Sequence, residues 1–247
     1  MRAIILAAGV GKRLVGLGAG RPKCLIEIGG RPLLRRLLES LAASSVAEAV
    51  VVVGFGEEAV RSEIGAGPEG IRVRYVTNPR YREGAILSLW SARESLDGPV
   101  LVMDADVLCP TSMIARLVGS SHPNCFLLDG SAENTGEEQM LLVRGDRVLG
   151  IVRGGAPGYE LQGESVGFLK LSAPAARLLR ELLEGRVAAG HTGIEHEETY
   201  PELLARVSVG YERVDAMPWT EIDFPEDVRR AEREVLPRIA ALESAGR

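Results

Sequence analysis

The chain has 247 residues, and its 29 Lys and Arg residues against 34 Asp and Glu residues give a formal net charge of −5. With 46% hydrophobic and 26% charged residues, its composition is typical of a soluble globular protein with one large domain or two small ones. The acidic balance argues against a general nucleic-acid-binding protein, because such proteins need a basic surface.

The cysteines and the apolar segments bear on the compartment. Cys24, Cys109 and Cys125 are odd in number and form no C-x-x-C pair, so the sequence indicates neither a disulfide framework nor a zinc site. The apolar start at residues 3–8 is too short for a signal-peptide core, and no apolar run approaches the roughly 18 residues of a membrane span. We therefore expect a cytoplasmic protein without a membrane span.

Lysine is rare in this chain. Its only lysines are Lys12, Lys23 and Lys170, and the rest of its 29 Lys and Arg residues are arginines. Two of the three lysines fall within the first 23 residues, so these two positions need an explanation.

The first half of the chain alternates apolar runs with helical patterns. Continuous apolar runs at residues 3–6 and 49–53 are typical of strands that are buried on both faces, as in a parallel sheet. Leucines at helical spacing predict a helix over residues 32–43. The further elements expected in this half are a helix over 57–64, a strand over 71–76, a helix over 85–96 and a strand over 99–103. Strands that alternate with helices predict an α/β fold with a Rossmann-like, doubly wound and mostly parallel sheet.

The second half is mixed in character. Two apolar runs around Gly145 and Asp146 predict a hairpin, which would begin a small β-rich lobe on the substrate side. The expected elements are strands over 139–143, 147–152, 164–171 and 211–214 and helices over 173–187, 201–207 and 226–242. Because no linker or repeat divides the chain, we expect one domain over 1–247, with a core of about 1–125 and 208–247 and a lobe of about 126–207.

A glycine-rich loop follows the first predicted strand. Residues 6–14 read L-A-A-G-V-G-K-R-L, in which two glycines let backbone amides approach phosphate oxygens. The dinucleotide fingerprint G-x-G-x-x-G fails at Leu14, and the P-loop pattern fails at Leu6 and Arg13. A glycine-rich turn without a ligand remains the alternative.

The motifs continue along the chain in a recognisable order. They are residues 6–13, Pro22 with Lys23, the Gly-x-Pro-Leu helix start at 30–33, and the segments N-P-R-Y at 78–81, S-L-W at 88–90, M-D-A-D at 103–106 and W-T-E-I-D-F-P-E-D at 219–227. Together they resemble the sugar-nucleotidyltransferase superfamily, in particular its phosphocholine cytidylyltransferase-like branch, which also includes inositol-phosphate and aminoalkylphosphonate cytidylyltransferases. The resemblance implies an enzyme that joins a nucleoside triphosphate to a small phosphorylated substrate and releases pyrophosphate.

The resemblance also implies roles for residues of the first loop and its surroundings. Arg13 would contact the β- and γ-phosphates with its planar fork, and Lys23 would be a compact charge at the α-phosphate, so both are candidate catalytic residues. For Lys12, an auxiliary phosphate contact and plain solvation are both open. The residues expected to bind the nucleotide are Leu6, Ala7, Ala8, Gly9, Gly11, Lys12 and Asp104.

Carboxylates at the end of a strand suggest a metal site. Asp104 and Asp106 lie two residues apart, so both side chains should lean to the same side of the sheet, at the edge where ligands bind in such folds. By the resemblance, Asp106 and Asp223 are ligands of Mg²⁺, the expected cofactor, and Asp104 supports them. The alternative for Asp223 is an N-cap of the last helix. The acceptor's phosphate oxygen is already anionic, so no general base is required, and Cys24 is expected to be structural.

The residues that recognise the acceptor are less well marked. A quaternary ammonium would need an aromatic cage, yet only 4% of residues are aromatic. Trp219 is the best placed candidate, Tyr159 and Tyr200 are further candidates, and Trp90 fits a core position better than a cage. Glu164 could bind an amine or hydroxyl group, or only cap a hairpin. Gly-Ala-Ile at residues 84–86 stands where phosphocholine members often carry an asparagine pair, which leaves the acceptor open.

The histidines near residue 195 do not form a known zinc motif. His191 and His196 lie among glutamates, but the pattern H-E-x-x-H has Tyr200 where the second histidine belongs, so we expect an acidic surface loop. The predicted function is Mg²⁺-dependent cytidylyl transfer from CTP to a small phospho- or phosphono-alcohol. The alternatives are a sugar-1-phosphate nucleotidyltransferase that uses another base and a non-catalytic regulatory nucleotide-binding protein. No nucleic-acid partner is expected, and a homodimer is left open.

Overall fold

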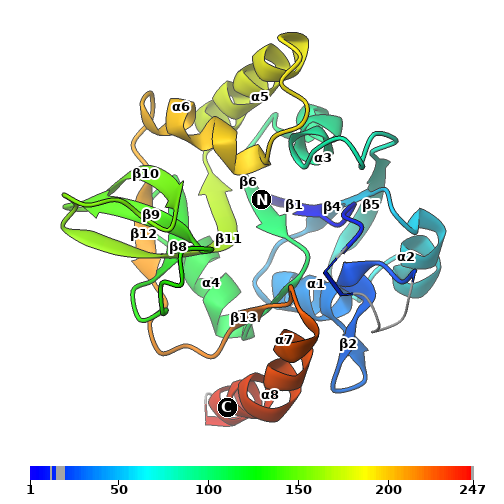
Figure 1. The fold of residues 1–247 in the computed structure, drawn as a ribbon. Coiled ribbons are helices and arrows are strands. Elements are labelled where there is room, and N and C mark those ends of the chain that lie inside the picture. Colours follow the sequence, from blue (N-terminus) through cyan, green and yellow to red (C-terminus); the bar gives the residue numbers. More distant parts are fainter. Residues whose placement is uncertain (12, 15–19, 246–247) are drawn as a thin grey trace.

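The protein is built around one large sheet with helices on both faces (Figure 1). The computed structural model describes residues 1–11, 13–14 and 20–245. The strands follow the order β10-β9-β11-β6-β1-β4-β5, and β8 pairs with β11 and β12. The strands of this sheet are β1 (Arg2–Leu6), β4 (Glu48–Val53), β5 (Arg72–Thr77), β6 (Val100–Asp104), β8 (Cys125–Asp129), β9 (Gln139–Arg144), β10 (Arg147–Arg153), β11 (Leu161–Leu171) and β12 (Gly210–Arg213).

The half of the sheet that carries the first strand is parallel, as the continuous apolar runs predict. β1 lies between β4 and β6 and pairs in parallel with both, and β4 pairs in parallel with β5. Alternate residues of one strand point to opposite faces. Ile5 therefore belongs to one core cluster and Ile4 to the other. Burial on both faces explains why these strands are apolar throughout.

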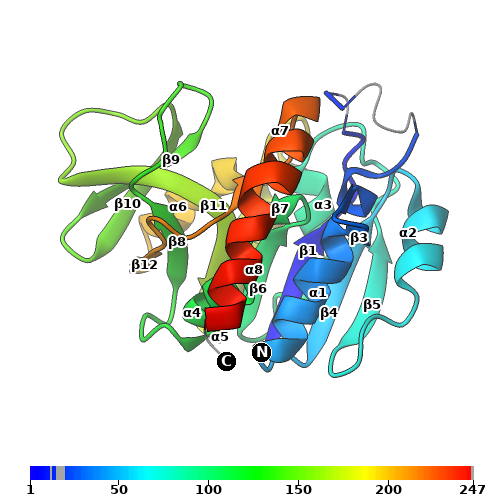
Figure 2. The ribbon, with the colours of Figure 1, turned by 90° about the horizontal axis from the view of Figure 1, so that it is seen from below.

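Helices cover both faces of the sheet, which makes the fold doubly wound (Figures 1 and 2). Leucines of α1 and apolar residues of α4 pack in the cluster that contains Ile5, and residues of α3 and α5 pack in the cluster that contains Ile4. The helices are α1 (Leu33–Ala43), α2 (Glu57–Ile64), α3 (Ile86–Ser91), α4 (Thr111–Gly119), α5 (Ala173–Ala188), α6 (Tyr200–Leu204), α7 (Pro225–Arg230) and α8 (Leu236–Ala245). Single turns of 3₁₀ helix lie at Lys23–Leu25, Arg93–Ser95 and His196–Thr199, and a π turn over Ala231–Val235 joins α7 to α8.

The antiparallel lobe is continuous with the parallel core. β9 and β10 form the predicted hairpin, whose turn contains Gly145 at a φ of +60°. One end of β11 pairs with β9 and the other with β6, so a single strand belongs to both parts of the sheet. The register of β11 against β8 shifts between Ser165 and Leu169. The prediction of a mixed α/β sheet with a β-rich lobe is confirmed, while α4 and β8 are elements that the sequence analysis did not predict.

A small ribbon ties the C-terminal segment to the end of β6. β7 (Val107–Leu108) pairs with β13 (Thr220–Glu221), and the Ile222 amide donates a hydrogen bond of 3.0 Å to the Asp106 carbonyl. A second two-stranded ribbon, β2 (Glu27–Ile28) with β3 (Arg31–Pro32), leads into α1. Residues of α8 pack beside Ile28 and Leu33 in a third core cluster (Figure 2). Within the described ranges, no helix is long and apolar enough to cross a membrane.

Candidate active site

The glycine loop lies at the carboxyl end of β1. The Ala7 amide donates to the Val52 carbonyl at 2.9 Å, and the Phe55 amide donates to the Ala8 carbonyl at 3.1 Å, so the start of the loop is fixed between β1 and β4. Ala7 and Ala8 are buried, and Leu6 is partly buried. This is the edge of a parallel sheet where ligands bind in α/β folds.

The loop runs over the side chain of Lys23. Gly11 has a φ of +61°, and a Cβ atom there would lie 3.3 Å from the Lys23 Cβ, so glycine permits this close approach. Around Gly9 no atom of the described residues lies within 4 Å of where a Cβ would be, so those residues leave its backbone open to a ligand. A cavity of about 330 Å³ opens here, and its lining includes Gly9, Gly11, Arg13, Lys23, Asp106 and Asp223. The expectation for Lys12 falls outside the described residues.

The ammonium group of Lys23 lies among carboxylates. Its Nζ atom is 2.6 Å from Asp106 Oδ2, 2.5 Å from Asp223 Oδ1 and 3.8 Å from Glu221 Oε1. The side chain is only 15% exposed. Burial works against the charged form of Lys23, but the three carboxylates outweigh it and raise its pKa, so the amine remains protonated.

Arg13 lies at the mouth of the same site. Its guanidinium is 3.4 Å from Asp223 Oδ2 and lies 5.4 Å from the centre of the Phe224 ring. More than half of its side chain is exposed. Arg13, Lys23, Asp106 and Asp223, which the sequence motifs single out from three distant segments, thus meet in one place.

Asp106, Glu221 and Asp223 form a set of oxygen donors. One carboxylate oxygen from each lies within 4.8 Å of the others. Asp106 Oδ1 is buried and has no hydrogen-bond partner among the residues that the structure describes, although such atoms are normally satisfied in folded proteins. A hard divalent cation takes oxygen ligands of this kind, so these residues fit such an ion.

Glu221 is a site residue that the sequence analysis did not identify. It precedes Asp223 by two positions, and Asp104 and Asp106 have the same spacing. This pair of acidic residues was the feature of the sequence that could have identified Glu221. Loss of hydration and the nearby Asp106 raise its pKa above the usual range, although Lys23 opposes the shift. The alternative role of Asp223 as an N-cap is wrong, because Phe224 is the N-cap of α7. The Asp227 carboxylate accepts the hydrogen bonds of the Asp223 and Phe224 amides.

Asp104 does not point to the same place as Asp106. β6 ends at Asp104, and the chain bends at the next two residues, so the alternation of a strand no longer applies to Asp106. The Asp104 carboxylate instead faces His196 and Glu197. Burial, Glu197 and Asp106 raise the pKa of Asp104 well above its usual value. The expectation that both aspartates lean to one side is therefore wrong, and the nucleotide contact of Asp104 remains a prediction.

The expectation of an acidic surface loop is also wrong for His196. His196 begins a 3₁₀ helix and is only 5% exposed, whereas His191 is exposed. The Ile86 amide donates to the Ile194 carbonyl at 3.1 Å, which ties this segment to the start of α3. Gly84 has room for no Cβ atom, because the Thr192 carbonyl lies against it. The Gly-Ala-Ile departure at 84–86 thus lets the segment before His196 approach α3.

The aromatic candidates have different environments. Tyr200 is 3% exposed and packs edge-on against Phe126 in the core, which speaks against a place in an aromatic cage. Trp90 packs on the core with the Arg93 guanidinium 3.9 Å above its ring, as the core interpretation predicts. Tyr159 lies in the loop between β10 and β11 and is not among the described residues that line the cavities of this edge. Trp219 donates a hydrogen bond of 2.8 Å to Asp129.

Glu164 lies inside β11, opposite Asp129 of β8, and not at a hairpin end. Burial, together with Glu138 and Asp129, raises the pKa of Glu164 to about 7. It lines two cavities, one of about 480 Å³ shared with Trp219 and one of about 200 Å³ shared with Arg13. The described residues around the smaller cavity include eight carboxylates and two arginines: Asp104, Glu137, Glu138, Glu164, Glu195, Glu197, Glu221 and Asp223 against Arg13 and Arg153.

Known proteins resemble this chain in sequence and in fold. The CMP-5'-(3-aminopropyl)phosphonate synthase of Streptomyces rubellomurinus is 39% identical over 121 residues, which cover 49% of this chain and 19% of that protein. A bifunctional IPC transferase and DIPP synthase of Rubrobacter xylanophilus is 31% identical over 95% of this chain and 52% of its own length. The chain thus spans about half, or less, of the length of these relatives.

The fold agrees with a solved structure of a CTP:phosphocholine cytidylyltransferase from Streptococcus pneumoniae. The TM-score is 0.75 at 22% sequence identity, and the match covers 94% of this chain and 97% of the other. This likeness confirms the predicted Rossmann-like α/β fold. Residues 3–150 match the family of MobA-like NTP transferase domains. They include the glycine loop, Arg13, Lys23 and Asp106, and the chain belongs to this nucleotidyltransferase family.

Proposed function

We propose that this chain is a cytidylyltransferase that transfers CMP from CTP to a small phosphorylated or phosphonylated acceptor and releases pyrophosphate. The observation that carries the proposal is the position of the Lys23 ammonium, which lies within 2.6 Å of both Asp106 and Asp223 beside the glycine loop. The names of the relatives from Streptomyces rubellomurinus and Streptococcus pneumoniae support the cytidine base.

The nucleotide would lie along the glycine loop with its triphosphate toward Arg13 and Lys23. The loop offers backbone groups around Gly9, where no side chain of the residues that the structure describes fills the space. Arg13 is exposed enough to turn to the terminal phosphates, and the buried Lys23 would meet the α-phosphate. The acceptor oxygen forms a bond to the α-phosphorus while the bond to the bridging oxygen of pyrophosphate breaks. Fixed positive charge at this point favours the crowded transition state.

Asp106, Glu221 and Asp223 are the residues that would hold Mg²⁺, because three carboxylates offer hard oxygen ligands. When bound, the cation would neutralise phosphate charge and orient the triphosphate. The orphaned Asp106 Oδ1 atom supports this assignment. Lys23 forms ion pairs with the same carboxylates, so the phosphates of the nucleotide would draw its ammonium away from Asp106 and Asp223.

The acidic cavity favours an acceptor with a cationic head group. Among the described lining residues, six carboxylates besides the proposed Mg²⁺ ligands Glu221 and Asp223 outnumber the two arginines, and Glu164 is held within β11. Trp219 is engaged by Asp129, and Tyr200 is buried in the core. A protonated primary amine donates hydrogen bonds to carboxylates and needs no aromatic cage, so an aminoalkylphosphonate fits better than a quaternary ammonium. An inositol phosphate would bring no positive charge to this cavity.

We infer that the core and the lobe act as one unit. β11 pairs with both parts, and one apolar cluster contains Val50 and Val100 of the core strands together with Leu141 and Val148 of the hairpin. Nucleotide and acceptor would therefore meet at a fixed junction and not across a flexible hinge.

Pyrophosphate release with each of the four ribonucleoside triphosphates tests the proposal. Each is combined with 2-aminoethylphosphonate, phosphocholine, inositol-1-phosphate or glucose-1-phosphate in the presence of Mg²⁺. We expect turnover with CTP and the aminoalkylphosphonate to exceed that of all other pairs. Turnover only with UTP, GTP or ATP and glucose-1-phosphate would support the sugar-1-phosphate alternative. Binding of CTP without any release would support a regulatory protein.

A further inference from the structure

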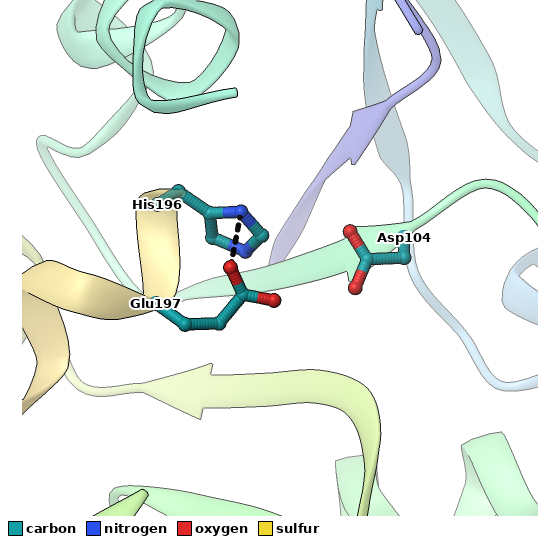
Figure 3. Close-up of side chains that lie close together, drawn as sticks. All are labelled: Asp104, His196 and Glu197. Atoms are coloured by element: carbon teal, nitrogen blue, oxygen red, sulfur yellow. Dashed lines mark ion pairs between the residues drawn. The ribbon is translucent and has the colours of Figure 1, made fainter. Parts of the chain in front are cut away.

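Asp104 belongs to a second group of potential metal ligands, together with His196 and Glu197. Asp104 ends β6, while His196 and Glu197 begin a 3₁₀ helix more than 90 residues later in the chain. Ligand atoms of all three residues lie within 4.8 Å of one another. In Figure 3 the imidazole ring and the Glu197 carboxylate both face the carboxylate of Asp104. This Asp104–His196–Glu197 group is distinct from the set of Asp106, Glu221 and Asp223.

The Nδ1 atom of the His196 imidazole is buried and has no hydrogen-bond partner among the described residues. The residue is 95% buried, and its Nδ1 atom lies 3.0 Å from Glu197 Oε2 without forming a hydrogen bond to it. The ring is held by an edge-on contact with Tyr200, with 5.6 Å between ring centres. A buried nitrogen without a partner is costly, so an ordinary structural histidine would be expected to have one.

The two carboxylates of the group lack a lysine or arginine partner among the described residues, although Glu197 Oε2 lies within ion-pair distance of His196 Nδ1. Within the part of the chain that the structure describes, neither Asp104 nor Glu197 forms an ion pair with lysine or arginine. Both side chains line the acidic cavity of about 200 Å³. A divalent cation would offset the charge of two carboxylates that converge with an imidazole at this partly buried point.

We propose that Asp104, His196 and Glu197 bind one divalent transition-metal cation, of the class of Zn²⁺, Co²⁺ or Mn²⁺. One imidazole and two carboxylates together suit ions of this class, whereas Mg²⁺ prefers oxygen ligands alone, such as those that Asp106 and Asp223 offer. Ligand atoms within 4.8 Å of one another reach a common ion through small side-chain rotations, because metal–nitrogen and metal–oxygen bonds are about 2.0–2.2 Å long. Three protein ligands leave coordination positions open, and two of the three residues line the cavity.

The position of the ligands explains why the sequence does not reveal such a site. The motif H-E-x-x-H takes two histidines from one helix face, but here His196 and Glu197 are adjacent and the third ligand comes from β6. The site also depends on the approach of the Thr192 segment to Gly84, which no local motif records.

Electron paramagnetic resonance of bound Mn²⁺ tests the proposal on the metal-free full chain. We expect two bound ions in the wild type, one of which shows the modulation of a directly bound nitrogen. His196→Gln should lose the nitrogen signal and one ion, and Asp223→Asn should lose the other ion but keep the nitrogen signal. Glu197→Gln should weaken the nitrogen-coupled ion at least about tenfold. The matched control is His191→Gln, because His191 is exposed on the same segment.

The nitrogen signal and the Mn²⁺ affinity can each overturn the proposal. A nitrogen signal absent from the wild type, or unchanged in His196→Gln, shows that His196 binds no metal. Circular dichroism monitors folding, and if His196→Gln does not fold, unchanged Mn²⁺ affinity in Glu197→Gln refutes the site. The measurement uses neither nucleotide nor acceptor, so a failure of the proposed cytidylyl transfer does not affect it.

Discussion

The Lys23 ammonium lies 2.5 Å from Asp223 Oδ1, although the two residues are 200 positions apart in the chain. The β7–β13 ribbon creates this contact, because it fixes the C-terminal segment to the end of β6. The same ribbon brings Glu221 to the site. A positive charge held at the centre of three carboxylates is the relationship on which the proposed chemistry depends.

Removal of the Lys23 charge should separate catalysis from folding. In Lys23→Met we expect turnover to fall at least about 100-fold, because a fixed charge at the transition state is lost. Lys23→Arg should recover no more than about a tenth of the wild-type rate, since a planar fork differs in shape from a compact ammonium. Mg²⁺ should raise the melting temperature of Lys23→Met more than that of the wild type, because the ammonium no longer competes for the carboxylates. Equal stabilisation in both proteins would contradict this.

The carboxylate set should govern the requirement for the metal. In Asp223→Asn and in Glu221→Gln we expect the Mg²⁺ concentration for half-maximal activity to rise at least about tenfold, because each variant removes an anionic ligand. Glu226→Gln, an exposed acid on α7 close by in sequence, is the control and should behave as the wild type does. If all three variants keep the wild-type metal dependence, these carboxylates do not bind the cation.

Glu164 predicts a pH dependence with a defined sign. Because its pKa is raised to about 7, its carboxylate is protonated in acid and becomes charged as the pH rises through 7. If the charged form binds the acceptor amine, KM for the acceptor should fall between pH 6 and 8, and Glu164→Gln should remove this fall.

The same raised pKa of Glu164 predicts how stability depends on pH. The protonated carboxyl of Glu164 contributes stability below its unfolded-state pKa of about 4.3, and this contribution is lost as the pH rises through 7. Between about pH 4.3 and 7, the melting temperature should therefore decline less in Glu164→Gln than in the wild type.

Two glycine substitutions should have opposite effects on stability. Gly167 has a φ of +81°, and a Cβ atom there would lie 2.5 Å from Asp104 Oδ2, so Gly167→Ala should destabilise the protein by more than about 1 kcal/mol. Gly185 lies in α5 with open space around it, so Gly185→Ala should stabilise the protein by about 0.4–1 kcal/mol. Urea unfolding measures both free energies. A stabilising Gly167→Ala would show that the close approach of β11 to Asp104 is absent.

The Trp219 indole should act through Asp129 more than through an aromatic cage. Trp219→Phe keeps an aromatic ring but loses the indole N–H that donates to Asp129, so the free energy of unfolding should fall by about 1–3 kcal/mol. We expect choline and amine acceptors to be affected equally. A selective loss of phosphocholine binding in Trp219→Phe would instead show that Trp219 is part of an aromatic cage.

The sequence predicts the core of this fold because its signals are local. The buried strands β1 and β4 and the helix α1 follow directly from continuous apolar runs and helical spacing. Arg13, Lys23, Asp106 and Asp223 were named because the order of the motifs resembles that of the sugar-nucleotidyltransferase superfamily. The prediction that Asp104 and Asp106 lean to the same side of the sheet is wrong, because the bend after β6 breaks the alternation of the strand. His196 could not be predicted as buried, since its environment comes from Gly84 and from the end of β6, which are distant in sequence.

Phosphorus-31 NMR of the reaction products tests the proposed function most directly. The full chain is incubated with CTP, Mg²⁺ and 2-aminoethylphosphonate, and the spectrum is followed with time. We predict a new coupled pair of signals from a phosphonate–phosphate anhydride together with pyrophosphate, present in the wild type and absent in Lys23→Met. A spectrum that shows only unreacted CTP and phosphonate, while UTP and glucose-1-phosphate react, would contradict the account.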